Sequence, residues 1–238
     1  MKNIILSVLL LCQLSSSENT FQISGVYSCD IKSSIFNTCV IVFFKTNEYY
    51  IEFENEPQKG SDDIGYFPFS YGIYKASHDT ILLIDKINNY KIVLKKYSNS
   101  LKVIQSFKWM QSCEFSHSLS PSSNWINSKV IYKDKTLKIL QKKKTFKKTG
   151  SQFIKSNLHS GKYSNESGYK LELNNKNYKF TILGFILSEG MWEKRSNNLI
   201  LRDSNLKAVF KLLIINDHKL ISSYLPGDFE GIAFEFSP

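Results

Sequence analysis

The feature that most constrains the fold is a frame that occurs twice without a gap, at residues 72–85 and 190–203. In each copy a glycine stands two residues before an aromatic residue, which is Tyr74 in the first copy and Trp192 in the second. A polar turn follows, and a second apolar segment then ends at an aspartate. A strand–turn–strand unit in two copies predicts a duplicated β-meander protein.

Apolar and polar residues alternate through the rest of both copies. Successive side chains of a strand point to opposite faces, so this period of two predicts half-buried strands. The positions expected to match are Val42, Phe44, Tyr49, Ile51 and Phe53 in the first copy and Leu171, Leu173, Tyr178, Phe180 and Ile182 in the second. About eight short strands per copy would let an up-and-down barrel close without exposed edges. We therefore predict an all-β protein of two tandem antiparallel meander β-barrels.

The domain boundaries follow from this pattern and from composition. We expect a first barrel over residues 21–117 and a second over 160–238, joined by a linker over 118–159. The linker begins with a Ser- and Pro-rich stretch and becomes lysine-rich. Within it, two apolar segments flank residues 133–136, which predicts a hairpin.

The N-terminus predicts export. Residues 4–12 form an apolar run that is too short to span a bilayer, which needs about 20 residues. Ser15 and Ser17 place small side chains where a signal peptidase requires them, so residues 1–17 are interpreted as a signal peptide. A buried N-terminal strand is the alternative. Lipidation of Cys12 is another, although Leu11 argues against it because the lipoprotein peptidase prefers a small residue there.

Three cysteines follow the expected cleavage point: Cys29, Cys39 and Cys113. Export permits disulfides, and an odd number of cysteines allows at most one internal bond. We predict a Cys29–Cys39 bond across the neck of a hairpin, where closing the loop stabilises the fold by about 3 kcal/mol. A closed barrel brings its last strand beside its first, so a Cys29–Cys113 bond is the alternative. Three buried, unpaired thiols are the third.

The positive charge is concentrated in one tract. The whole chain has 31 basic and 21 acidic residues, a net charge of +10, and residues 129–155 alone hold ten lysines against the single acid Asp134, or +9. The densest part is Lys142, Lys143, Lys144, Lys147 and Lys148. These lysines could bind anionic lipid headgroups, polyanionic glycans or nucleic acid by charge attraction, or simply be a solvated linker. Nucleic acid is the least favoured partner, because export separates the protein from it.

No catalytic or metal-binding set emerges from the sequence. The four histidines lack neighbouring ligands at metal-binding spacing, and no nucleophile or phosphate-binding motif occurs. Asp85 and Asp203 occupy equivalent positions and are interpreted as turn aspartates rather than as paired catalytic carboxylates. Tyr74 and Trp192 are candidates for the floor of an apolar pocket, with core packing as the alternative. We therefore expect no enzyme and no cofactor.

The glycine–aromatic pairs that begin short alternating strands, at Tyr27, Tyr163 and Trp192, resemble the lipocalin-like small barrels of exported bacterial proteins. The resemblance covers both copies and implies closed meanders, often with an apolar interior. Each copy is shorter than a full lipocalin, so side chains can fill the interior. The expected function is that of an exported binding or interaction protein of the cell envelope. The alternative is a carrier or chaperone of a small hydrophobic ligand held inside a barrel.

Overall fold

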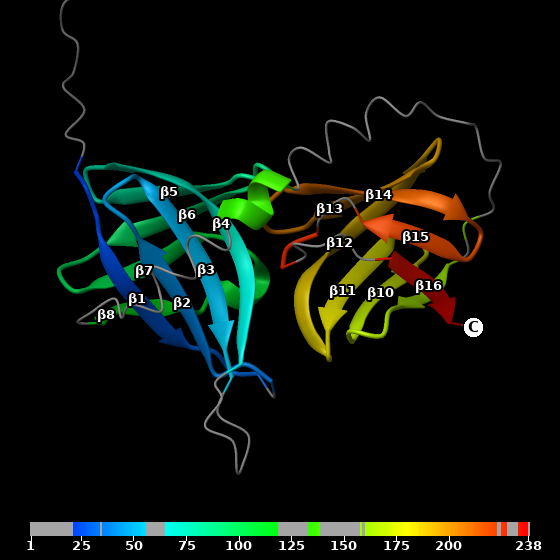
Figure 1. Ribbon diagram of the computed structural model, residues 1–238, viewed down its shortest axis with the longest axis horizontal. Coiled ribbons are helices and arrows are strands. Elements are labelled where there is room, and N and C mark those ends of the chain that lie inside the picture. The colour runs from blue at the N-terminus through cyan, green and yellow to red at the C-terminus, as the bar shows by residue number, and fades with distance from the viewer. Residues whose placement is uncertain are drawn as a thin grey trace, which may run out of the picture.

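The structure is a computed structural model of the full chain, and it describes residues 21–33, 35–55, 65–118, 133–138, 158, 160–222, 225–227 and 233–237. Within these ranges it consists of two closed antiparallel barrels that lie side by side (Figure 1). Each barrel has eight strands in sequential order. The prediction of an all-β chain with two tandem meander barrels is confirmed.

Every strand pairs with its neighbours in the sequence. The first barrel contains β1 (Gly25–Asp30), β2 (Thr38–Phe43), β3 (Glu48–Glu54), β4 (Tyr66–Ser77), β5 (Thr80–Asp85), β6 (Lys91–Lys96), β7 (Ser100–Gln105) and β8 (Glu114–Ser118), with the 3₁₀ turn η1 (Lys108–Met110) before β8. The second contains β9 (Gly161–Ser164), β10 (Tyr169–Asn174), β11 (Asn177–Ile182), β12 (Phe185–Arg195), β13 (Asn198–Asp203), β14 (Val209–Asn216), β15 (Lys219–Ser222) and β16 (Ala233–Ser237). Pairing of β1 with β8 and of β9 with β16 closes the two barrels, which leaves neither with an open edge.

The register corrects one part of the expected repeat. Phe43 lies opposite Tyr49 in the first barrel, and Leu173 lies opposite Tyr178 in the second. The turn between β2 and β3 is therefore one residue longer than the turn between β10 and β11. Because a shift of one residue moves a side chain to the other face, Val42 and Phe44 lie on the outer face of their barrel, whereas Leu171 and Leu173, their expected counterparts, lie in the interior.

The outer face of the first barrel carries a small apolar cluster of its own. It consists of Val26, Val40, Val42, Tyr50 and Tyr71, all at most 3% exposed. Strand β3 is consequently buried on both faces, from Glu48 to Phe53. Strand β3 therefore does not show the buried–exposed alternation expected for a half-buried strand, because its outer face is also buried.

A short helix at residues 133–138 replaces the expected hairpin. Lys133 forms an ion pair with Glu48 of β3 at 3.4 Å, and Thr136 is fully buried. The same Glu48 carboxylate accepts a hydrogen bond from the Tyr71 hydroxyl at 2.5 Å. The residues predicted to form a turn thus form a helix that is tied to the outer face of the first barrel.

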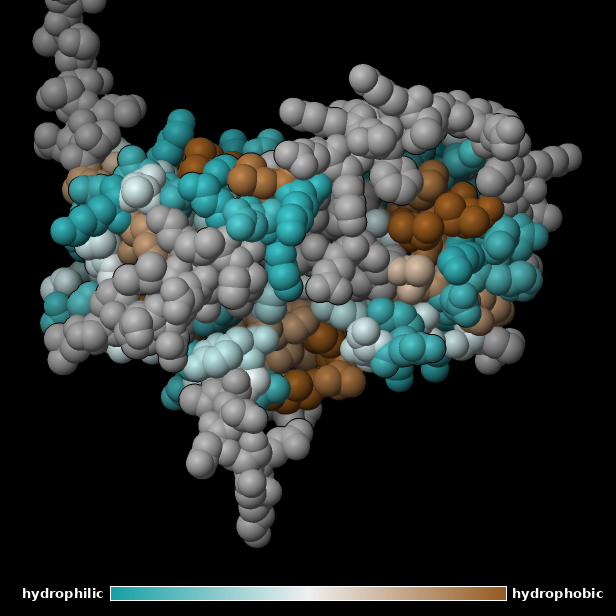
Figure 2. Space-filling model, viewed as in Figure 1, coloured by the Kyte–Doolittle hydropathy of each residue, from teal (hydrophilic) through white to brown (hydrophobic). Residues whose placement is uncertain are grey.

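The two barrels pack against each other through aromatic side chains. Phe185 of β12 contacts Phe36, Phe53 and Trp109 of the first barrel, with ring centroids 5.5, 5.5 and 5.9 Å away. Nearby, Lys108 forms an ion pair with Glu189 at 2.7 Å. Hydrophobic surface is visible between the two halves of the molecule in Figure 2. One continuous core therefore runs through both barrels.

The two glycines of the repeated frame permit close contact between neighbouring backbones. A Cβ atom on Gly72 would lie 2.0 Å from the Ile84 carbonyl oxygen, and one on Gly190 would lie 2.0 Å from the carbonyl oxygen of Arg202. Side-chain carbons do not approach other atoms so closely, so only glycine fits at either position. Each copy of the repeated frame therefore needs a glycine at this position, so that two neighbouring strands can come this close.

We predict that Gly72→Ala and Gly190→Ala each lower the free energy of unfolding by about 3 kcal/mol, since the strands must separate to admit the methyl group. Urea unfolding of the two variants measures this effect. Gly65→Ala is the matched control, because its Cβ would meet its nearest neighbour at an ordinary 3.4 Å. Equal stability of all three variants would contradict this role for the glycines.

Candidate functional site

Tyr74 lies inside the first barrel and is part of its hydrophobic core. The side chain is 3% exposed and its ring packs edge-to-face on Phe43, with centroids 5.2 Å apart. Its hydroxyl donates a hydrogen bond to the carbonyl oxygen of Ile23 at 2.5 Å, and the carbonyl oxygen of Phe44 lies 3.2 Å away and shares the same proton. Tyr74 also lines a pocket of about 450 Å³, together with Phe21, Gln22, Asn47, Lys75, Ala76 and Ser77.

Trp192 occupies the equivalent position in the second barrel. It lies opposite Leu201 and is partly buried against the core. Its indole Nε1 is buried and meets no hydrogen-bond acceptor in the described part of the chain. The structure thus places the two candidate pocket residues in separate barrels and does not bring them together.

A buried hydrogen-bond chain occurs at the same place in both barrels. In the first, the Tyr49 hydroxyl lies 3.1 Å from Ser70 Oγ, which donates to Asp85 Oδ2 at 2.9 Å. In the second, the corresponding contacts are Tyr178–Ser188 at 2.7 Å and Ser188–Asp203 at 2.7 Å. Because each serine hydrogen is directed to the aspartate, the tyrosine is the donor to the serine.

The aspartates of these chains also hold the turns that follow them. Asp85 Oδ1 accepts the backbone N–H groups of Ile87 and Asn88, at 2.9 and 2.6 Å. Asp203 Oδ1 accepts those of Asn205 and Leu206, at 2.9 and 2.8 Å. Their interpretation as turn aspartates is confirmed. The sequence analysis did not predict the hydrogen bonds that these aspartates accept from Ser70 and Ser188. Each serine stands 15 residues before its aspartate, so no local pattern connects the two.

These chains stabilise the fold and offer no reactive group. Burial raises the pKa of Tyr49 and Tyr178, and the charges of the nearby aspartates raise it further, so both phenols stay protonated at neutral pH. Ser70 and Ser188 are 1% and 3% exposed, so a substrate cannot reach them. Among the described residues, the hydrogen bonds of these two chains involve no histidine that could act as the base for a serine.

The three cysteines of the first barrel lie together. Cys29 lies directly opposite Cys39 in the β1–β2 pair, and β1 also pairs with β8, which begins just after Cys113. Directly opposite residues in an antiparallel pair have Cα atoms about 4.5–5.5 Å apart, which is within the range for a disulfide. All three are free thiols in the structure, so the Cys29–Cys39 bond stays a prediction.

The cysteine cluster is chemically protected in its reduced form. The hydrogen bond with Cys113 lowers the pKa of the Cys29 thiol, whereas the hydrogen bond with Cys39 and burial raise it. The net effect is a Cys29 pKa well above its ordinary value. Burial raises the pKa of Cys39, and contact with Cys29 raises that of Cys113. Little thiolate is therefore present at neutral pH, and thiolate is the form that reacts.

We predict that Cys29→Ser abolishes the internal disulfide of the oxidised protein and lowers its stability by about 3 kcal/mol. Cys113→Ser should leave a Cys29–Cys39 bond intact. Alkylation of the denatured proteins with and without reductant, followed by mass spectrometry, counts the thiols in each. Strand β1, which contains Cys29, lies between β2 with Cys39 and β8, which follows Cys113. A Cys39–Cys113 bond in oxidised Cys29→Ser would therefore contradict this order of strands.

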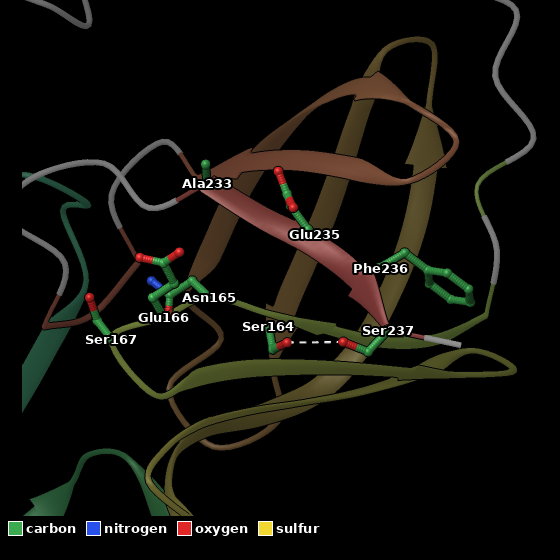
Figure 3. Close-up of a pocket in the computed structure, with 8 residues that line it drawn as sticks. All are labelled: Ser164, Asn165, Glu166, Ser167, Ala233, Glu235, Phe236 and Ser237. Carbon is green, nitrogen blue, oxygen red and sulfur yellow. Dashed lines mark hydrogen bonds between the residues drawn. The ribbon is translucent and has the colours of Figure 1, made fainter.

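An open polar pocket of about 630 Å³ lies on the second barrel, beside β9 and β16 (Figure 3). Ser164 and Ser237 share a hydrogen bond of 3.0 Å across these strands. Glu166 and Glu235 supply carboxylates, and the latter is ion-paired with Lys219 at 3.3 Å. The lining residues that the structure describes combine hydroxyls and carboxylates, and none of them is a histidine or cysteine that could act as base or nucleophile.

Several sequence predictions fall outside the described residues. These are the signal peptide with Cys12 and the lysines Lys142, Lys143, Lys144, Lys147 and Lys148. Within the described ranges, no three His, Cys, Asp or Glu side chains are placed to hold a metal ion. No helix in those ranges has the length and apolar character required to cross a membrane.

The outer side of strands β4–β7 carries an apolar patch that the sequence analysis did not predict. Ile73 lies directly opposite Ile84, and Leu82 lies opposite Val93, so four aliphatic side chains form a block across three strands. Ile104 of β7 adds a side chain that is 60% exposed. None of the five belongs to the core of the barrel.

Lysines surround this patch. Lys75 lies opposite Leu82, Lys91 lies opposite Ile84, and Lys95 pairs with Lys102 across β6 and β7. Lys95 and Lys102 form exposed ion pairs with Asp79 at 3.2 Å and Glu114 at 3.8 Å. Lys75 and Lys91 form no ion pair within the described part of the chain. We call these five aliphatic residues and four lysines the lysine-rimmed face.

The second barrel differs from this face at a rim position and a central position. Arg202 stands where the first barrel has Ile84, and Glu193 stands where it has Lys75. These two residues form an ion pair of 2.8 Å, which Glu193 extends to Arg195 at 2.9 Å. The interiors of the two barrels are thus built alike, whereas their outer faces differ at these two positions. Met191 and Ile200, which correspond to Ile73 and Leu82, keep apolar side chains there.

A signal for the face was present in the sequence. Residues 81–84 are four consecutive apolar residues, whereas the corresponding residues 199–202 end in Arg202. A strand with one solvated face alternates, so an unbroken apolar run indicates that both faces are apolar. Both segments fit an alternating strand pattern equally well, so alternation alone does not distinguish them.

Compared with models of known protein families, with curated proteins and with solved structures, the chain gives no match.

Proposed function

We propose that the chain is an exported, non-enzymatic binding protein of the cell envelope, built on two lipocalin-like barrels and acting through its outer surface. The observation that carries the proposal is the lysine-rimmed face on β4–β7. It combines exposed Ile73 and Ile104 and the half-buried aliphatic residues between them with positive charge. Exposed apolar patches with polar rims commonly mark sites of interaction.

The packing of the barrel interiors supports an outer binding site. Large side chains that include Tyr49, Phe53 and Phe69 are at most 2% exposed inside the first barrel, and Phe180 and Phe234 are fully buried in the second. Ring-to-ring contacts connect many of these residues. Barrels of eight strands are often just filled by their own side chains.

A carrier of a small hydrophobic ligand is the second candidate. The pocket of about 450 Å³ beside Tyr74 and Phe21 favours it, because this volume would accommodate a small molecule. The two candidates differ in whether a small molecule stays bound through purification. A carrier retains its ligand, whereas a surface-binding protein does not.

We predict that the exported protein, purified without detergent, has the same mass in native and denaturing mass spectrometry, apart from solvent. The denatured mass should also correspond to a chain that begins at Glu18. Additional mass that is lost on denaturation would contradict the surface-binding proposal and favour the carrier. A full-length mass would contradict the predicted cleavage.

A further inference from the structure

We propose that the lysine-rimmed face is a docking site for an anionic lipid bilayer. The inference rests on the proposed function, because it identifies the partner of the same face. Five features of the molecule carry it: the aliphatic centre of the face, its lysine charges, Tyr97 at its edge, the positive rim that disfavours a second copy, and the contrast with the second barrel.

The composition of the face fits lipid better than protein. Protein interfaces are enriched in Trp, Tyr and Arg and depleted in Lys. The centre of this face has Ile73, Leu82, Ile84 and Val93, and its rim has lysines. Aliphatic side chains can enter the acyl boundary of a bilayer, while lysine stems extend along them and keep the ammonium groups at the level of the headgroups.

The charges at the rim are suited to anionic headgroups. Lys75 and Lys91 have no carboxylate partner in the described ranges, and the ion pairs of Lys95 and Lys102 are exposed and therefore weak. Each lysine held near an anionic membrane raises its affinity about fivefold.

Tyr97 lies at the edge of the face and supports the same orientation. It is 45% exposed, and the Nζ atoms of Lys95 and Lys102 lie 6.0 and 5.7 Å from the centre of its ring. Tyrosine is enriched at the boundary between membrane and water, because its ring is apolar and its hydroxyl is polar.

A second copy of the chain is a poor occupant of the face. In a two-fold symmetric dimer the same surface meets itself, so the lysines of one copy would oppose those of the other. The positive rim therefore disfavours self-association and favours a negatively charged partner.

The second barrel provides the variant that tests the inference. Lys75→Glu/Ile84→Arg gives the first barrel the ion pair that Glu193 and Arg202 already form at the equivalent positions, so the substitutions suit the fold. Arg202→Gln is the matched control, because it alters the other barrel at the same position. The lysine tract of residues 142–148 is unchanged in all proteins.

The experiment is sedimentation of the full mature chain with two kinds of vesicle, phosphatidylcholine alone and phosphatidylcholine mixed with phosphatidylglycerol. We expect the protein to bind the mixed vesicles and to lose affinity as salt is added. Lys75→Glu/Ile84→Arg should bind about tenfold more weakly or worse, because it removes one rim lysine and one central aliphatic residue. Arg202→Gln should bind like the natural chain.

Three results would overturn the inference. Equal binding to both vesicles would exclude a requirement for anionic lipid, and equal binding by Lys75→Glu/Ile84→Arg would exclude the face. If neither vesicle binds the natural chain, the lipid proposal is overturned, and sedimentation with a cell-envelope fraction then tests the proposed function itself. Binding to that fraction that is lost in Lys75→Glu/Ile84→Arg would keep the proposed function with a partner other than lipid. No binding to the fraction would overturn both the lipid proposal and the proposed function.

Discussion

The close approach of two backbones at a glycine is the constraint on which both barrels depend. Gly72 lies against the Ile84 carbonyl and Gly190 against that of Arg202, at distances that exclude any side chain. A few residues away, the buried Tyr–Ser–Asp chains fix the turns that follow β5 and β13. Together these contacts hold three consecutive strands of each barrel in one register, and the remaining strands close around them.

The two barrels share an interior design but present different exteriors. The buried tyrosine, serine and aspartate occupy the same positions in both, because each depends on the others for its hydrogen bonds. No such dependence constrains the outward positions, where Ile84 in one barrel corresponds to Arg202 in the other. Differences in function between the barrels are therefore expected on their outer faces.

The sequence predicted the barrels well because the strands alternate and the glycine frame occurs twice. It did not predict that Phe185 joins the barrels or that β3 is buried on both faces, since contacts between distant segments leave no local pattern. The error at Val42 and Phe44 arose from one additional turn residue, which reverses the faces of a strand. The lysine-rimmed face was missed because its apolar residues were attributed to strands in general, although the run that ends at Ile84 differs from its counterpart.

The most direct test of the account is to move the face from one barrel to the other. In a chain that carries Lys75→Glu/Ile84→Arg, the further substitutions Glu193→Lys, Arg202→Ile and Lys211→Val give the second barrel the residues that the first barrel has at these positions. The measurement is the affinity of this chain for vesicles that contain phosphatidylglycerol. The account predicts that binding returns. A chain that folds normally and still fails to bind would contradict the claim that these outward residues carry the function.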